Sequence, residues 1–313
     1  MARMESTRID VHHHLFPPAF VAGLVDSGHY LSHGVARHWT PQVSIDDMDA
    51  AGVATAYTSI TAPGFDVVAP GRRTAATREC NEFGTRMAAD FPGRFGLFAS
   101  LPLPDVDASL TEIDYAFDVL KVDGIGLLTS YRDKWLGDPA FAPVMDELDR
   151  RKAVVYVHPT TPDCCRNLMP GIADWVIEFP VDTTRTIASL LFSGTVARCR
   201  NIRFIFAHLG GILPLIADHL ARAAAVDAQL ASRVGGTVLD KLRAFHYDTA
   251  LRAHPGALAA ALHLVEVSQI LFGTDAPLRR SSDQLQGLLD HGFTPEALRQ
   301  IESGNARRLL SRA

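Results

Sequence analysis

The feature that most constrains the fold is an eightfold alternation of short apolar, β-branched runs with longer segments of helical period. Such alternation is expected of repeated βα units, in which each parallel strand is followed by a helix that packs on the sheet. Several of the runs are apolar throughout, as strands buried on both faces are. The predicted strands cover residues 8–14, 53–60, 94–101, 124–130, 154–158, 202–208, 245–249 and 269–275.

Eight such units predict an α/β fold, a (β/α)₈ TIM barrel. The length of 313 residues suits one barrel, since barrels of this kind span about 200 to more than 400 residues. No linker rich in glycine, serine or proline divides the chain, so residues 1–313 are expected to form a single domain. Two aperiodic stretches, 26–42 and 159–180, are predicted to be loop insertions at the C-terminal face, where barrels carry their active sites.

Composition and charge limit the partners of this chain. The formal net charge is −5 with both signs interspersed, and no basic block is present, which argues against nucleic acid as a partner. The polar N-terminal residues and the absence of a long apolar run argue against a secretory signal and against a membrane. Four cysteines are too few for a disulfide framework, so reduced thiols and a cytoplasmic location are expected.

Three histidines lie together at the end of the first predicted strand, at positions 12–14. Side chains of an extended strand alternate between its two faces, so His12 and His14 should point the same way and His13 the opposite way. Two imidazoles on one face can hold the same metal ion. The spacing alone is weak evidence, because many histidine pairs of this kind are structural.

The same arrangement recurs at other strand ends. His158 ends the fifth predicted strand, His208 the sixth and Asp275 the eighth. A single polar residue after an apolar strand is usually a cap or a turn residue. Together with His12 and His14, however, these residues all lie at the strand ends that converge at one mouth of a barrel, which predicts a functional site there.

These motifs resemble the amidohydrolase superfamily, and within it the branch of aminocarboxymuconate-semialdehyde decarboxylase and related non-oxidative decarboxylases. The resemblance extends over almost the whole chain. It is carried by Ile9-Asp10-Val11-His12-His13-His14, Val157-His158-Pro159, Phe206-Ala207-His208-Leu209-Gly210-Gly211, Phe272-Gly273-Thr274-Asp275 and Gly304-Asn305-Ala306-Arg307-Arg308-Leu309-Leu310.

The resemblance implies one divalent metal ion bound by His12, His14, His158 and Asp275, with His208 beside it as a catalytic group rather than a ligand. Imidazoles with a carboxylate suit Zn²⁺, and Mn²⁺ is the second choice. Members with two metal ions use a carboxylated lysine at the end of the fourth strand. Residues 124–130 contain no lysine, so one ion is favoured over two.

Residues 43–49 and 59–64 are similar to the 6-methylsalicylate decarboxylases of this branch. The resemblance therefore favours release of CO₂ from a hydroxylated aromatic, salicylate-like acid or another conjugated carboxylic acid, with Asp275 or His208 protonating the carbon that bears the carboxylate. The alternative is a metal-dependent hydrolase or hydratase acting on a lactone, an amide or an unsaturated acid. A third possibility is a barrel without activity that serves as a scaffold.

Two departures from related enzymes narrow the substrate. An arginine that binds the substrate of aminocarboxymuconate-semialdehyde decarboxylases is replaced by His219, which disfavours a dicarboxylate. Resorcylate-type relatives begin with Glu-x-His and continue the sixth motif with Gly-Glu. Here the corresponding residues are His12-x-His14 and Gly210-Gly211, which disfavours that substrate class as well.

Further predictions concern the walls of the pocket and the assembly. Arg166, Tyr131 and Trp39 are predicted to contact the substrate, a small carboxylic acid. Cys164 and Cys165 are expected to be inert. The resemblance implies a homodimer or a higher homo-oligomer. The histidines expected to be structural or exposed are His29, His33, His246, His254 and His263.

Overall fold

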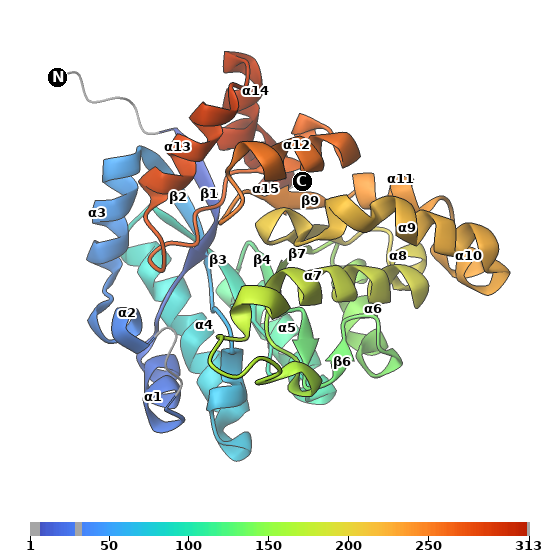
Figure 1. Ribbon diagram of the computed structural model, residues 1–313. Helices are drawn as coiled ribbons and strands as arrows, with labels where there is room; N and C mark the ends of the chain where they lie inside the picture. Colours follow the sequence, from blue (N-terminus) through green and yellow to red (C-terminus); the bar gives the residue numbers. More distant parts are fainter. Residues whose placement is uncertain (1–6, 29–32, 312–313) are drawn as a thin grey trace.

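Eight parallel strands form one continuous sheet in the computed structural model, which describes residues 7–28 and 33–311 (Figure 1). Each strand pairs with the next along the chain, and helices cover the outside, so the predicted (β/α)₈ barrel is confirmed. The strands are β1 (Arg8–His14), β2 (Val53–Ser59), β3 (Phe95–Ser100), β4 (Gly124–Leu128), β7 (Val154–His158), β8 (Arg203–Phe206), β9 (His246–Asp248) and β10 (Ile270–Leu271), and a small hairpin of β5 (Ser130–Tyr131) and β6 (Lys134–Trp135) follows β4.

The barrel closes between the last strand and the first. The N–H of Val11 donates to the carbonyl of Phe272 (3.0 Å), and the N–H of Asp275 donates to the carbonyl of His12 (2.9 Å). The buried carboxylate of Asp10 supports this seam by accepting a hydrogen bond from the hydroxyl of Thr274 (2.6 Å). The closure therefore brings residues from opposite ends of the chain to the same mouth of the barrel.

The helices lie outside the sheet, and side chains cap the N-termini of several of them. The Thr294 hydroxyl accepts from the N–H of Ala297 (3.2 Å) at the start of a helix whose first residue is proline. The helices are α1 (Pro18–Asp26), α2 (His33–His38), α3 (Pro41–Ala51), α4 (Arg73–Asp90), α5 (Val106–Tyr115), α6 (Ala142–Arg150), α7 (Trp175–Phe192), α8 (Thr195–Arg198), α9 (Leu213–Val226), α10 (Ala228–Val234), α11 (Val238–Arg243), α12 (Pro255–Leu264), α13 (Ser281–His291), α14 (Pro295–Arg299) and α15 (Asn305–Leu310).

The two predicted loop insertions contain more helix than expected. Stretch 26–42 includes α2, which buries Ala36 against the core, and the six residues of this helix are too few to show a helical period in the sequence. Stretch 159–180 contains a short 3₁₀ helix at Asp163–Cys165, and its last residues, including Pro180, belong to α7. Residues 29–32 of the first stretch lie outside the described part of the chain.

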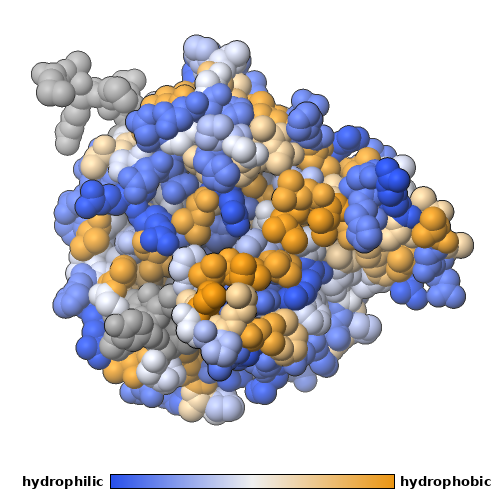
Figure 2. All heavy atoms as spheres, viewed as in Figure 1, coloured by the Kyte–Doolittle hydropathy of each residue, from blue (hydrophilic) through white to orange (hydrophobic). Residues whose placement is uncertain are grey.

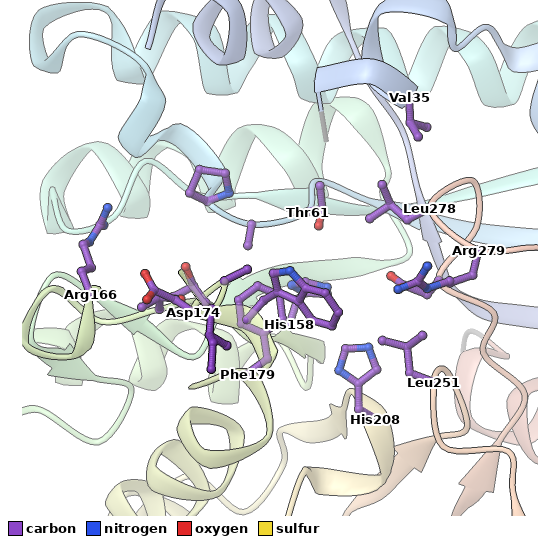
Figure 3. Close-up of a pocket in the computed structure, with 18 of the residues that line it drawn as sticks. Val35, Thr61, His158, Arg166, Asp174, Phe179, His208, Leu251, Leu278 and Arg279 are labelled. Carbon is purple, nitrogen blue, oxygen red and sulfur yellow. The ribbon is translucent and has the colours of Figure 1, made fainter. Parts of the chain in front are cut away.

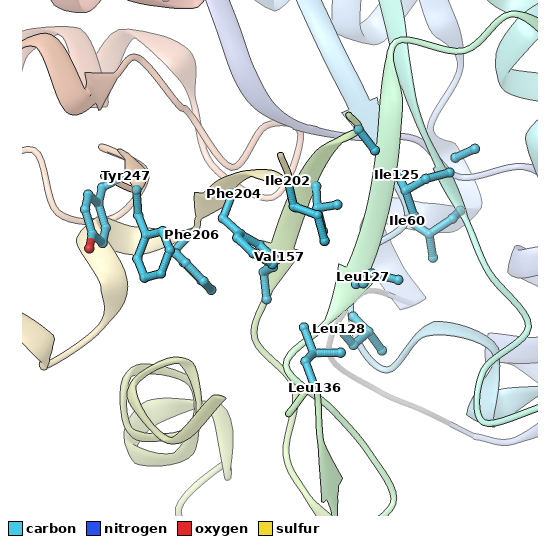
Figure 4. Packing of buried hydrophobic residues seen from close by; sticks show 14 of the residues in the cluster. Ile60, Ile125, Leu127, Leu128, Leu136, Val157, Ile202, Phe204, Phe206 and Tyr247 are labelled. Atoms are coloured by element: carbon cyan, nitrogen blue, oxygen red, sulfur yellow. The ribbon is translucent and has the colours of Figure 1, made fainter. Parts of the chain in front are cut away.

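The alternation of side chains along each strand creates two apolar layers. In β7, Tyr156 points into the barrel and stacks on Phe98 (5.4 Å between ring centroids), whereas Val157 points outward among the helices. Figure 4 shows this outer layer, in which Phe204 and Phe206 of the neighbouring strand also pack. The inner layer fills the barrel below the strand ends and forms a solid floor for the site above it.

The connection that follows β8 is fixed against α7 by a close approach of two backbones. Gly211 has a positive φ of 73°, and a Cβ atom at this position would lie 2.0 Å from the carbonyl oxygen of Pro180. The hydroxyl of Thr184 accepts from the N–H of Ile212 (3.1 Å) and donates to the carbonyl of Gly210 (3.2 Å). A glycine is thus required here for the loop that begins at the strand end to hold its position.

We expect Gly211→Ala to lower the free energy of unfolding by about 3 kcal/mol, because the methyl group collides with backbone that cannot move aside. Gly93→Ala is the matched control, since Gly93 has a similar φ of 78° but open space around its Cβ position. That variant should cost only the left-handed strain, about 1 kcal/mol. Urea unfolding of both variants measures the difference, and equal losses would contradict the steric explanation.

Candidate metal centre

The three consecutive histidines of β1 alternate as the strand geometry predicts. The Nε2 atoms of His12 and His14 lie 3.1 Å apart, and both side chains are fully buried. His13 points to the other face, where its ring nitrogens bond to the Asp10 carboxylate (3.0 Å) and the Ser44 hydroxyl (2.8 Å). His13 is therefore a satisfied structural histidine, and the other two face the mouth of the barrel.

The remaining predicted site residues converge on this pair. Asp275 Oδ1 lies 3.0 Å from the Nε2 atom of His14 and 3.3 Å from that of His12. Potential ligand atoms of His12, His158, His208 and Asp275 all lie within 4.8 Å of one another. The ring centroids of His14 and His158 are also 4.8 Å apart. One buried group thus contains four imidazoles and one carboxylate, a donor set that fits a divalent cation.

Three of these imidazoles are oriented through their outer nitrogen. Each Nδ1 atom lies within hydrogen-bonding distance of an oxygen, and Nε2 is thereby presented to the centre of the group, as in metal-binding histidines. The partners are Asp248 Oδ2 for His12 (3.0 Å), the Ser59 carbonyl for His14 (3.2 Å) and the Pro159 carbonyl for His158 (2.8 Å).

His208 differs from the other three imidazoles. Its Nε2 atom is buried and has no hydrogen-bond partner among the residues that the structure describes. His208 and Asp275 both have positive φ values, 56° and 65°, in positions where non-glycine residues are uncommon. Strained backbone of this kind is typical of functional sites, where surrounding structure holds it in place.

The electrostatics of the group favour neutral imidazoles beside an ionised carboxylate. Burial and the neighbouring imidazoles hold the pKa of His158 well below its usual value, and burial lowers the pKa of His208 to about 4. Burial opposes the ionised form of Asp275, but contacts with His12 and His14 hold the pKa of its carboxyl well below the usual range.

His12 is the exception among the imidazoles. Burial disfavours its charged form, yet the adjacent Asp248 carboxylate outweighs this effect and raises the pKa of His12 to about 10. The Nε2 atom of His12 must be free of a proton to bind a cation, so metal binding would displace one proton from this ring.

Asp248 is the functional residue that sequence reasoning missed. Its Oδ1 atom accepts hydrogen bonds from the N–H groups of His208 (3.1 Å) and Ala250 (2.9 Å), while Oδ2 contacts His12. It ends β9, whose other residues are His246 and Tyr247 rather than an apolar run. The signal that marked His158, His208 and Asp275, a polar residue after an apolar strand, is therefore weaker for Asp248.

A cavity of about 590 Å³ opens above the group (Figure 3). His158, His208 and Asp275 form its polar floor, and its size suits a small organic molecule. The walls are largely apolar, and the other lining residues are Val35, Thr61, Ala62, Pro63, Thr160, Thr161, Arg166, Asn167, Ile172, Ala173, Asp174, Trp175, Phe179, Leu251, Leu278 and Arg279.

Of the three predicted substrate contacts, the structure brings only Arg166 to this cavity. Trp39 is buried in the core, where its indole N–H donates to the Ser44 hydroxyl (2.9 Å). Tyr131 is also buried, and its hydroxyl accepts from the N–H of Leu128 (3.0 Å). Both rings pack in the core, where burial of their aromatic surface stabilises the fold.

Other histidines and cysteines noted in the sequence lie away from the lining of the cavity. His254 caps α12 by accepting from the N–H of Ala257 (3.3 Å), and burial lowers the pKa of His246 to about 4. Cys164 and Cys165 have their sulfur atoms 3.1 Å apart, and neither lines the cavity. His29 lies outside the described residues. No helix within residues 7–28 and 33–311 is long and apolar enough to cross a membrane.

Comparison with known proteins agrees with this geometry. The sequence pattern of the amidohydrolase family matches residues 9–312 of the chain. The chain belongs to the amidohydrolase family. The resemblance inferred from the strand-end motifs is thereby confirmed, and the match includes every residue of the buried group.

Curated relatives of this amidohydrolase include fungal decarboxylases. Decarboxylase yanB of Aspergillus niger is 38% identical over 284 residues, which cover 86% of this chain and 77% of that protein. The 6-methylsalicylic acid decarboxylase acuB of Aspergillus aculeatus is 34% identical over 97% of this chain and 96% of its own length.

A solved structure shares the fold of this amidohydrolase. It is the 5-carboxyvanillate decarboxylase from Novosphingobium aromaticivorans in complex with manganese and 4-hydroxy-3-methoxy-5-nitrobenzoic acid. Its TM-score is 0.86 at 17% sequence identity, and the alignment covers all of both chains.

We expect Asp248→Asn to weaken metal binding by about 10- to 100-fold, because an amide NH₂ cannot accept the hydrogen bond from His12 Nδ1 while its oxygen still serves the backbone. Competition with a chelator measures the affinity. Asp182→Asn is the control, since Asp182 is equally buried but bonds to Thr129, Ser130 and Trp135 instead. Equal metal affinity in both variants would contradict this role of Asp248.

Proposed function

We propose that this amidohydrolase is a metal-dependent, non-oxidative decarboxylase that releases CO₂ from a hydroxylated aromatic, salicylate-like acid. The observation that carries the proposal is the buried group of four histidines and Asp275 at the floor of a largely apolar cavity. The curated relatives named above, which include a 6-methylsalicylic acid decarboxylase, point to the same reaction.

The ligands in this proposal are His12, His14, His158 and Asp275. Each of the three imidazoles has its outer nitrogen at an oxygen of the protein, which is the usual support of a metal-binding histidine. In contrast, the Nε2 atom of His208 has no hydrogen-bond partner within the described residues, although a ring nitrogen of His208 lies within 4.8 Å of ligand atoms of His12, His158 and Asp275. We therefore infer that His208 acts on the substrate and is not a ligand of the metal ion.

Zn²⁺ is the proposed ion, because imidazole-rich sites suit it, and Mn²⁺ is the alternative. The structural relative that contains manganese keeps the second choice open. When bound, the cation supplies Lewis-acid stabilisation of negative charge on the substrate's oxygen atoms. Reconstitution of the metal-free protein with each ion decides between them.

His208 carries the proton in the proposed reaction. Because burial keeps this imidazole neutral, its Nε2 atom can accept the proton of the substrate's phenol. The same atom then donates that proton to the ring carbon bearing the carboxylate. The bond between this carbon and the carboxylate breaks, CO₂ leaves, and the phenolate product takes a proton from water.

Asp275 has a different role from His208. Its pKa lies well below the usual range, so it is ionised and has no proton to give. We therefore prefer His208 over Asp275 as the acid that protonates the ring carbon. The apolar side chains of Phe179, Leu251 and Leu278 line the cavity beside these groups and exclude water, which strengthens the electrostatic interactions of the site.

Three further predictions from the sequence stay predictions: a single domain, a cytoplasmic location and a homodimer or higher homo-oligomer. Exposed apolar side chains on α7 and α9 support the last of these, since contiguous apolar surface marks interaction sites. Figure 2 shows hydrophobic residues gathered on the face that carries these helices. Among them Val176, Ile177 and Leu215 are 43%, 47% and 76% exposed.

We expect the metal-loaded protein to release CO₂ from at least one member of a panel of salicylates, including 6-methylsalicylate. The measurement is headspace CO₂ together with chromatography of the phenol product. A chelator should abolish the release, and Zn²⁺ or Mn²⁺ should restore it. Absence of CO₂ together with ring opening of a lactone or hydrolysis of an amide would reverse the assignment in favour of a hydrolase.

The division of roles predicts two classes of variant. His158→Ala and Asp275→Ala should lose the metal ion, whereas His208→Ala should keep about one ion per chain and lose turnover by about 10²- to 10⁴-fold. Elemental analysis and initial rates measure these properties. His254→Ala, which alters a helix cap away from the cavity, is the control and should retain both. Metal loss in His208→Ala equal to that in the other two variants would refute the division.

A further inference from the structure

The charged groups around the cavity are almost all paired with protein partners. Asp275 contacts His12 and His14, and Asp174 accepts a hydrogen bond from the N–H of Asn167 (2.8 Å). The guanidinium group of Arg166, the predicted substrate contact, lies 2.9 Å from the carboxylate of Asp163. This ion pair partly offsets the charge of Arg166 and reduces its attraction for a ligand.

Arg279 is the exception. It lines the cavity and is exposed, and across residues 7–28 and 33–311 no carboxylate forms an ion pair with it. A cation that faces a cavity without a partner favours the binding of an anion there, and guanidinium groups bind carboxylates with two parallel hydrogen bonds.

The backbone places Arg279 close to the proposed chemistry. Its N–H donates to the carbonyl of Asp275 (3.0 Å), so the turn after β10 carries both residues. Figure 3 shows Arg279 at the same end of the cavity as His208 and Leu251, whereas Arg166 lies at the opposite end. An acid held by Arg279 would therefore lie at the end of the cavity that contains His208 and the apolar side chains of Leu251 and Leu278.

We infer that Arg279 binds the carboxylate of the substrate and selects aromatic acids over their uncharged analogues. The inference rests on the proposed function for the nature of the substrate. Arg279 is a specificity-determining residue in this account. It binds the ground state of the acid, so its removal affects affinity more than the rate of the bound complex.

The binding test uses benzoate and benzamide, which have the same shape but differ in charge. Metal-loaded wild-type protein is titrated with each compound, and binding is followed by tryptophan fluorescence, since Trp175 lines the cavity. We expect the preference for benzoate over benzamide to fall by about 10-fold or more in Arg279→Met. Arg279→Lys should keep part of the preference, because it retains the charge without the planar fork.

Arg280→Met is the matched control, because Arg280 is the next residue and is also exposed but does not line the cavity. The preference of Arg280→Met for benzoate over benzamide should equal that of the wild type. The contribution of the metal ion to ligand binding cancels in this comparison, since every variant is measured at the same metal content. An unchanged preference in Arg279→Met, or an equal fall in Arg280→Met, would overturn the inference.

Kinetics separate this inference from the proposed function. With a substrate that releases CO₂, Arg279→Met should raise KM by about 10- to 100-fold and leave kcat nearly unchanged. If the wild type releases CO₂ but the benzoate preference does not depend on Arg279, only the inference fails. If the preference depends on Arg279 but no acid loses CO₂, the proposed function fails and the anion site stands.

Discussion

The site depends on the hydrogen bonds that close the barrel between β10 and β1. The N–H of Asp275 donates to the carbonyl of His12, and this bond places the carboxylate beside the imidazole of His14, which is 261 residues away from it in the chain. Parallel strands run in one direction, so their polar end residues meet at a single mouth. An open sheet of the same strands would leave Asp275 at one edge and His12 at the other, with no common centre.

Burial makes this centre chemically useful and also costly. An imidazole or a carboxylate removed from water needs partners, and each member of the group except His208 finds them in the protein. Asp248 is central here, because it contacts His12 and also accepts the backbone N–H of His208. One buried carboxylate therefore orients both a proposed ligand and the proposed proton carrier.

The floor and the walls of the cavity have different proposed roles. His158, His208 and Asp275 supply donors at the floor, whereas Phe179 and Leu251 offer apolar surface to a ring. Such a combination suits a small aromatic acid, since the ring gains burial and the acid finds charge. Arg166 and Arg279 both line the cavity, but Arg166 forms an ion pair with Asp163. Arg279 is therefore the lining arginine that remains available to an anionic ligand.

The sequence by itself determined the eight strands, the barrel and the five residues of the buried group. These depend on local alternation and on residue type: His12 and His14 share a face, and His13 does not, because a strand repeats every two residues. Only the tertiary structure decided that Tyr131 and Trp39 turn into the core and that Asp248 supports His12. The core positions of Tyr131 and Trp39 depend on contacts between distant segments. The ion pair between Asp163 and Arg166 is local, but a spacing of three residues only permits such a pair, and the loop conformation decides whether it forms.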